Sequence, residues 1–307
     1  MSAAEIDTTV ELAGIPLRNP VLTASGTFGY GTEFAPFLDL REIGGFVAKS
    51  LTLEPRVGNP PPRIAEAASA MLNAISLENV GVEAFLSEKL PAIPDGVTVI
   101  ASIFGTELDE YAEVAKRLSE EPRVAGLEVN ASCPHVKSGG IEFGQDPEVL
   151  ANLVRAVRGS TQKPLLIKLS PNVTSIAEMG RICEGEGADG ISLINAVQAL
   201  EVDIERRRPV LANGLGGLSG PAILPIALRM VWQVAKAVDI PICGIGGIRS
   251  GADAVKFLLC GASAVQVGTA NYLNPMAAIE VAGGVADYAA AHGFLRVSDL
   301  IGALEMS

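Results

Sequence analysis

The stretch IPICGIGGIRSGADAVKFLLCGASAVQVGT, residues 240–269, contains the unit that decides the fold. An apolar run over 240–246 is followed by a helical segment over 250–260, and a second apolar run begins at residue 263. Neither run alternates between apolar and polar residues, which is typical of parallel strands covered on both faces. Ser250 is a favourable capping residue for the intervening helix. The stretch therefore predicts a strand, a helix and a second strand parallel to the first.

The same unit recurs along the whole chain. Eight apolar runs are present: VLTAS from 21, GFVAKS from 45, VTVIAS from 97, AGLEVN from 125, PLLIKLS from 164, DGISLIN from 189, IPICGIG from 240 and SAVQVG from 263. Predicted helices include 79–90, 107–119, 147–159, 175–187, 222–238 and 250–260. Eight such units predict an α/β fold of the (β/α)8 TIM-barrel type, as one domain over residues 1–307. A Rossmann-like layer is the alternative, but no GxGxxG follows the first strand.

Three segments lie outside this repeating unit. TTVELAGIPLRNP, residues 8–20, alternates in polarity around a Gly turn and predicts an N-terminal β-hairpin that closes the bottom of the barrel. The connections 50–78 and 196–221 are longer than a βα loop requires. Long loops in compact domains are usually functional, so we expect both to form active-site loops.

Charge and hydropathy argue against several classes of protein. The chain has 23 Lys and Arg against 35 Asp and Glu, a net charge of −12 that disfavours nucleic acid as a partner. Mean hydropathy is +0.35, yet no apolar run approaches the roughly 20 residues that span a bilayer, so no membrane association is expected. The start, MSAAEIDTTVEL, does not resemble a secretion signal, which predicts a cytoplasmic location. The four cysteines form no CxxC pair, so no metal site is expected.

The ends of the predicted strands supply candidate site residues, because the C-terminal ends of barrel strands face the active site. A single lysine there would more simply form a surface ion pair. Two lysines facing two asparagine amides indicate an anionic ligand, and the late glycines suit a phosphate bound by backbone N–H groups. The residues that close the runs are Ser25, Lys49, Ser50, Ser102, Asn130, Lys168, Asn195, Gly246, Gly247, Gly268 and Thr269.

The segment NASCPHVKSGG, residues 130–140, directly follows the fourth strand. Cys133 lies three residues beyond the strand end, before a Gly-Gly loop, where it is placed to act as a base or nucleophile under a lid. The simpler alternative, a small buried hydrophobe, is assigned to the other three cysteines, Cys183, Cys243 and Cys260. His135 is either an acid–base group or a solvated loop residue.

Two further features are given structural interpretations. His292 follows a run of alanines at the end of a helix and is interpreted as a C-terminal cap. The charged run 205–208 is a lid, a partner contact or a solvated loop, of which the solvated loop is the default.

In order and spacing, the motifs of this chain resemble those of the class 1 dihydroorotate dehydrogenases, most closely the catalytic subunit of the NAD-linked type. The resemblance covers essentially the whole chain, and eight motifs in order are far more specific than one Gly-rich loop. The motifs are ASGTFGYG, KSLTLEPRVGNPPPR, MLNAISLEN, NASCPHVKSGG, KLSPNVT, RRPVLANGLGGLSGPA, GIGGI and VGTANYLNP.

The resemblance implies an FMN-dependent oxidation of dihydroorotate to orotate in pyrimidine biosynthesis. It implies that Cys133 is the base that removes a proton from C5 while a hydride passes from C6 to FMN, and that Lys168 places a cation beside the reduced flavin. The implied FMN contacts are Ser25, Lys49, Ser50, Asn130, Lys168, Ile194, Gly220, Gly246, Gly247, Gly268 and Thr269. The implied substrate contacts are Lys49, Asn73, Ala74, Ile75, Ser76, Leu77, Asn130, Asn195 and Ala196.

The resemblance also implies partner proteins. The family type pairs a homodimer of this chain with a second subunit that carries FAD and a [2Fe–2S] cluster, giving a heterotetramer. The cysteines of this chain do not suit such a cluster, which agrees with a separate electron-transfer subunit.

Three positions depart from the family pattern and keep other functions open. Ser76 replaces the Gly of NAIGLQN, His135 replaces the Asn of SCPN, and Ala196 replaces a Thr or Ser. These changes favour, as an alternative, a related FMN-dependent oxidoreductase acting on another small acid. Two further alternatives are a Schiff-base barrel aldolase that uses Lys168 or Lys49, and a flavin-binding subunit without catalysis.

Overall fold

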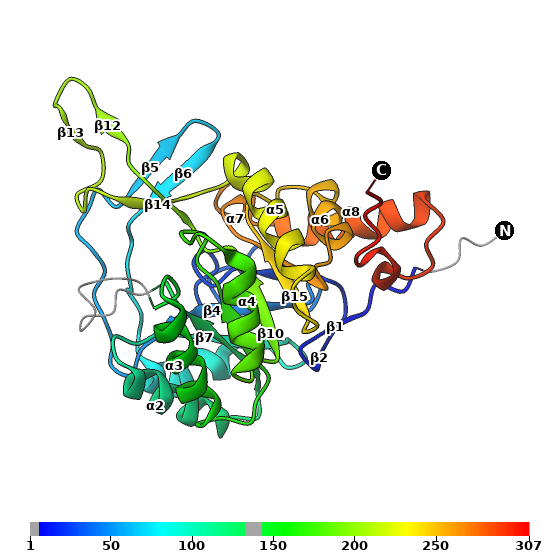
Figure 1. The fold of residues 1–307 in the computed structure, drawn as a ribbon, viewed down its shortest axis with the longest axis horizontal. Coiled ribbons are helices and arrows are strands. Elements are labelled where there is room, and N and C mark those ends of the chain that lie inside the picture. The colour runs from blue at the N-terminus through cyan, green and yellow to red at the C-terminus, as the bar shows by residue number, and fades with distance from the viewer. Residues whose placement is uncertain (1–5, 133–142, 307) are drawn as a thin grey trace.

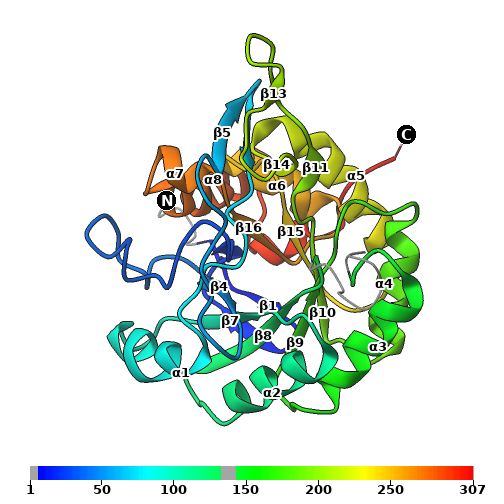
Figure 2. The ribbon, with the colours of Figure 1, turned by 90° about the vertical axis from the view of Figure 1, so that its left-hand side faces the viewer.

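A closed barrel of eight parallel strands forms the centre of the computed structural model, which describes residues 6–132 and 143–306. Around the barrel the strands follow the order β10-β15-β16-β3-β4-β7-β8-β9, and each neighbouring pair is parallel (Figure 2). Every predicted apolar run supplies one strand, so the predicted (β/α)8 barrel is confirmed. The strands are β3 (Val21–Thr23), β4 (Gly45–Leu51), β7 (Val99–Ile103), β8 (Val124–Asn130), β9 (Leu165–Lys168), β10 (Gly190–Leu193), β15 (Ile242–Ile245) and β16 (Ala264–Val267).

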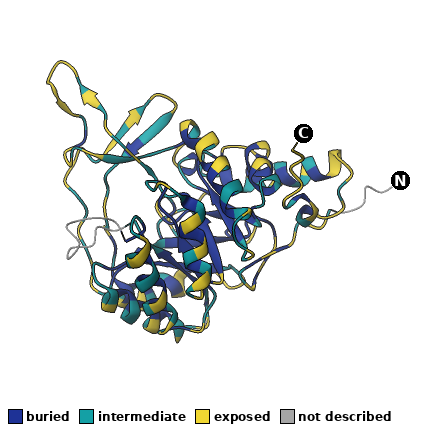
Figure 3. Ribbon diagram, in the orientation of Figure 1, coloured by how far each residue is buried: buried dark blue, intermediate teal, exposed yellow. Residues whose placement is uncertain are grey.

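Helices form the outer layer and turn their apolar faces to the barrel (Figure 3). They are α1 (Val82–Ala84), α2 (Leu108–Ser119), α3 (Pro147–Arg158), α4 (Ile176–Gly185), α5 (Leu224–Ala235), α6 (Gly251–Leu259), α7 (Ala270–Leu273) and α8 (Ala277–Ala291). Capping residues start several of them. The Asp146 carboxylate accepts the N–H groups of Glu148 and Val149 at the start of α3, and the Ser250 hydroxyl accepts that of Asp253 in α6.

The segment predicted as a helix over 79–90 differs in detail. Its α-helical part covers only three residues and continues as a π-helical turn, η1 (Phe85–Lys89), and a 3-10 turn, η2 (Leu90–Ala92). Gly81, with φ +79°, delays the helix start, and Pro91 near the far end has no N–H for an α-helical hydrogen bond. The helical segment therefore begins and ends later than predicted.

The high mean hydropathy is explained by strands that are buried on both faces. All residues of β7, β9, β10, β15 and β16 are buried. Among residues 6–132 and 143–306, no helix combines the length and the apolar character needed to cross a bilayer. The apolar residues of these strands thus lie in the protein core.

The predicted N-terminal hairpin is present as β1 (Val10–Leu12) and β2 (Ile15–Leu17). It packs at the amino ends of the barrel strands, where a Cβ added to Gly126 at the start of β8 would lie 2.7 Å from the Ile15 side chain. A Cβ on Gly190, at the start of β10, would lie 3.2 Å from Ala13. These contacts close the barrel at the end opposite to the strand C-termini.

The two long connections pair with each other in a second sheet, which the sequence did not predict. This small sheet has the antiparallel order β11-β14-β6-β5, and it lies away from both chain ends in Figure 1. Its strands are β5 (Ile64–Ala67), β6 (Ala70–Asn73), β11 (Val197–Ala199) and β14 (Gly216–Ser219), and the hairpin of β12 (Val202–Asp203) and β13 (Arg208–Pro209) projects beyond them. Residues 205–208 are exposed, which agrees with the solvated loop.

Candidate active site

A cavity of about 560 Å³ lies between the C-terminal ends of the barrel strands and the small sheet. The structure brings together, around this one cavity, every described residue that the sequence assigned to FMN or to substrate. They are Ser25, Lys49, Ser50, Asn73, Ala74, Ile75, Ser76, Leu77, Asn130, Lys168, Ile194, Asn195, Ala196, Gly220, Gly246, Gly247, Gly268 and Thr269. Their proximity agrees with a shared site, while their individual roles stay predictions.

The description of the segment after β8 ends at Ser132. Cys133 and His135 lie outside the described residues, and their roles stay predictions. Ser132, the last described residue before them, lines the cavity, and its backbone N–H donates to Asn130 Oδ1 at 3.2 Å. The described part of this segment therefore ends at the wall of the cavity.

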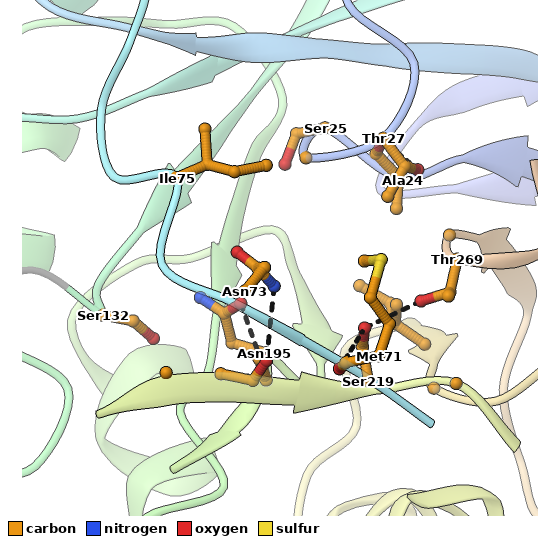
Figure 4. Close-up of a pocket in the computed structure, with 18 of the residues that line it drawn as sticks. Ala24, Ser25, Thr27, Met71, Asn73, Ile75, Ser132, Asn195, Ser219 and Thr269 are labelled. Atoms are coloured by element: carbon orange, nitrogen blue, oxygen red, sulfur yellow. Dashed lines mark hydrogen bonds between the residues drawn. The ribbon is translucent and has the colours of Figure 1, made fainter. Parts of the chain in front are cut away.

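Bare backbone lines the cavity beyond β15 and β16. Gly246 and Gly247 have φ values of +132° and +76°, a region that side chains other than glycine rarely adopt. Gly268 follows β16, and the Thr269 hydroxyl next to it donates to Ser219 Oγ at 2.8 Å (Figure 4). Peptide groups of these residues thus line the cavity, and backbone N–H groups of this kind can bind a phosphate.

Hydrogen bonds join the amides on the opposite side of the cavity. Asn195 Nδ2 donates to Asn130 Oδ1 at 3.1 Å, and Tyr111 on α2 donates its hydroxyl to the Asn130 backbone carbonyl at 2.7 Å. Behind them the hydroxyls of Ser50 and Ser102 are 2.8 Å apart. Ser102 is buried and does not line the cavity, so the structure places it behind the site. The two asparagines are held in one orientation before any ligand binds.

Asn73 belongs to the small sheet and lines the same cavity as Asn195 (Figure 4). Its side chain donates to the Gly217 carbonyl at 3.3 Å, across the pairing of β6 with β14. The sequence indicated the site role of the connection around Asn73, but it carried no signal for its partner 144 residues away.

The Lys49 side chain projects from β4 into the cavity wall and is half-buried. Burial lowers the pKa of Lys49; the charge of Glu78 raises it in part, and that of Arg63 lowers it further. Glu78 forms its ion pair with Arg63 at 2.6 Å, so it does not neutralise Lys49 directly. A carboxylate ligand would therefore stabilise the charged form of Lys49, which burial disfavours.

Lys168, at the end of β9, lies on the floor of the cavity and has a buried acidic neighbour. Its Nζ is 3.7 Å from Oε1 of Glu128, whose other oxygen accepts a hydrogen bond from Gln266 Nε2 at 2.6 Å. Glu128 and Gln266 were not predicted as site residues, because AGLEVN and SAVQVG were interpreted as simply apolar runs. The available signal was a charged or amide residue inside a strand that must be buried.

Of the residues predicted to have structural roles, Cys183, Cys243 and His292 are found in such positions, whereas Cys260 is less buried than predicted. Cys183 and Cys243 are fully buried, and burial raises the pKa of each thiol far above its usual range; for Cys243 the charge of Glu128 adds to this. Cys260 is half-buried at the end of α6. His292 follows α8, with Nδ1 2.9 Å from the Tyr288 carbonyl oxygen, so the predicted cap is confirmed.

Ser76 has an unfavourable backbone conformation, with φ +65°. Such a left-handed conformation costs an L-residue roughly 1 to 2 kcal/mol. Glycine avoids this cost, and only part of the gain is lost to the higher conformational entropy of glycine in the unfolded state. We expect Ser76→Gly to raise the free energy of unfolding by about 0.5 to 1 kcal/mol in urea titrations. Ser87→Gly, within the helical turn η1, is the control and should lower it by about 0.5 kcal/mol. A loss of stability in Ser76→Gly would contradict the interpretation that the backbone of Ser76 is strained.

Comparison with known proteins relates this geometry to one family. The dihydroorotate dehydrogenase family model matches residues 8–288. The catalytic subunit of dihydroorotate dehydrogenase B (NAD(+)) from Pelobacter propionicus is 58% identical over 300 residues, which cover 97% of this chain and 99% of that protein. The proteins of the same name from Trichlorobacter lovleyi and Geotalea daltonii are 58% and 57% identical, covering 97% and 99% of this chain and 98% and 100% of theirs. The similarity spans the barrel and both long connections.

Proposed function

Because the chain belongs to the dihydroorotate dehydrogenase family, we propose that it is a catalytic subunit that oxidises dihydroorotate to orotate in pyrimidine biosynthesis. The observation that carries this proposal is that one cavity combines two lysines, hydrogen-bonded asparagine side chains and glycine backbone. Dihydroorotate is a carboxylate on a ring with amide groups, so it needs cations and amide partners. The cavity supplies both at the ends of the barrel strands.

FMN is the flavin that we assign to this cavity. The backbone around Gly246, Gly247, Gly268 and Thr269 lines the cavity, so its peptide groups would hold the phosphate. When bound, FMN would supply the acceptor for the hydride that leaves C6 of dihydroorotate. The other residues that would hold it are Ser25, Lys49, Ser50, Asn130, Lys168, Ile194 and Gly220.

The substrate subsite that we propose lies between Lys49 and the side-chain amides of Asn73, Asn130 and Asn195. Lys49 would bind the carboxylate, and Asn73, Asn130 and Asn195 would hydrogen-bond the ring. The residues that would set its shape are Ala74, Ile75, Ser76, Leu77 and Ala196. Cys133 would take the proton from C5. Loss of this proton and of the hydride from C6 would form the C5=C6 double bond of orotate.

The partner that we propose is a separate electron-transfer subunit carrying FAD and a [2Fe–2S] cluster. The support is the name of the relatives, which are catalytic subunits of an NAD(+) enzyme. We place a homodimer of this chain with two such subunits in the cytoplasm, with neither nucleic acid nor membrane as a partner. Co-expression with a candidate subunit, followed by mass measurement of the purified complex, tests this assembly.

Anaerobic addition of dihydroorotate to the purified protein tests the reaction. The proposal expects a yellow protein that releases FMN on denaturation and whose flavin absorbance bleaches with dihydroorotate. Bleaching only with another dihydro acid would favour the altered-substrate alternative that Ser76 and Ala196 suggested. A colourless protein that borohydride traps on its substrate would instead favour the Schiff-base aldolase.

Lys49→Met separates substrate binding from stability. We expect KM for dihydroorotate to rise about tenfold or more, because a charge-assisted hydrogen bond is lost. The ligand-free variant should unfold at higher urea concentration than wild type at neutral pH, because the lowered pKa of Lys49 shows that the folded state disfavours its charged form. This gain should shrink as pH rises toward 10.5, where unfolded lysine also loses its proton. An unchanged KM would contradict the assignment.

A further inference from the structure

Two charged side chains are buried together inside the barrel, beneath the cavity. Glu128 on β8 is fully buried and Lys168 on β9 is 5% exposed. Among residues 6–132 and 143–306 one other charged residue, Asp253, is buried, and it belongs to the start of α6. The charges in the barrel interior therefore form one isolated pair just below the site.

The carboxylate of Glu128 is fixed from across the barrel. Gln266 lies on β16, which is not a neighbour of β8 in the strand order, so their 2.6 Å hydrogen bond must cross the interior. That bond occupies Oε2, while Oε1 has no hydrogen-bond partner and is the oxygen nearest Lys168. Gln266 thus holds the carboxylate so that its second oxygen points to the lysine.

The separation of the pair is informative. At 3.7 Å, Lys168 Nζ and Glu128 Oε1 interact as charges but are too far apart for a hydrogen bond. Lys168 lines the cavity and Glu128 does not, so the lysine is the nearer of the two charges to a ligand in the cavity. Charges in a buried environment are little screened. A ligand in the cavity would therefore interact with both the positive charge of the lysine and the negative charge of the carboxylate.

We propose that Glu128 is a positioning residue that lowers the reduction potential of the bound flavin by partly cancelling the charge of Lys168. This inference rests on the proposed FMN site. Reduction adds negative charge to the flavin, which Lys168 stabilises and the more distant carboxylate opposes. The pair would therefore set how readily the flavin passes its electrons onward, independently of substrate contacts.

Glu128→Gln keeps the shape of the side chain and removes its charge. Redox titration of the FMN-loaded variant should give a more positive midpoint potential than wild type. We expect a shift of the equilibrium toward reduced flavin of about tenfold, which is about 30 mV for a two-electron couple. An unchanged potential would overturn the proposal.

Two further variants make the test independent of folding. Ser192→Ala is the matched control, because Ser192 pairs in register with Lys168, is buried and has an unpartnered hydroxyl without charge. It should leave the potential unchanged, and a shift as large as that of Glu128→Gln would overturn the charge argument. Glu128→Asp retracts the carboxylate from Lys168 and should shift the potential less, in the same direction. If Glu128→Gln does not fold, the absence of any shift in Glu128→Asp overturns the proposal.

The flavin released by denaturing wild-type protein distinguishes failure of the proposed function from failure of the role of Glu128. If wild type releases no FMN, the proposed function fails, whatever the variants do. If wild type releases FMN and the potentials of wild type and Glu128→Gln coincide, only the role of Glu128 fails.

Discussion

Cys133→Ser is expected to lower the rate of flavin reduction by dihydroorotate by about 10² to 10⁴-fold, the usual contribution of a positioned base. FMN content should stay the same, because no FMN contact is assigned to this residue. Rapid mixing under anaerobic conditions measures the reduction step directly. Cys260→Ser, which changes a half-buried cysteine at the end of α6, is the matched control and should reduce flavin at the wild-type rate.

The pH dependence of the same reaction provides an independent check. A cysteine base with an ordinary pKa of about 8.5 is mostly protonated at neutral pH, so the wild-type rate should rise as pH increases toward that value. A serine hydroxyl loses its proton only at much higher pH, and the Cys133→Ser profile should move upward accordingly. A variant with the wild-type rate and profile would show that Cys133 is not the base.

Lys168→Met is expected to weaken both the fold and the flavin site. Its removal leaves Glu128 as an unpaired buried charge, which costs roughly 3 to 5 kcal/mol of unfolding free energy. FMN should also dissociate at least tenfold more readily, because the cavity floor loses its cation. Urea unfolding of the ligand-free protein and fluorescence titration with FMN measure the two effects separately.

The double variant Glu128→Gln with Lys168→Met is the control for this prediction. Removing both charges leaves no lone ion in the barrel, so most of the lost stability should return. FMN affinity should remain low, because the cation is still absent. If Lys168→Met unfolds at the same urea concentration as wild type, the pair does not have the energetic role described above.

The barrel was predictable because its strands are dictated by local sequence. Runs such as PLLIKLS are apolar on both faces, and only a parallel sheet covered by helices buries them completely. The small sheet was not predictable in the same way. Its strands are three or four residues long, and Gly216 and Gly217 in β14 have low strand propensity, so they depend on pairing with β6, which lies far away in the chain.

The site shows the same division between local and distant information. Lys49, Asn130 and Lys168 were predicted because each ends an apolar run. Glu128 was missed because its environment is set by Gln266, which lies 138 residues later and on the far side of the barrel. A buried acid can be recognised in a sequence, but its partner is known only once the strand order is known.

The pairing of β6 with β14 has a consequence for engineering this chain. The hydrogen-bond ladder between them makes residues 50–78 and 196–221 one mechanical unit, although 117 residues separate them along the chain. Exchanging one connection for that of a relative would leave a mismatched strand edge above the cavity. A chimera that changes substrate choice should therefore transplant both connections together, as a single two-piece module on an unchanged barrel.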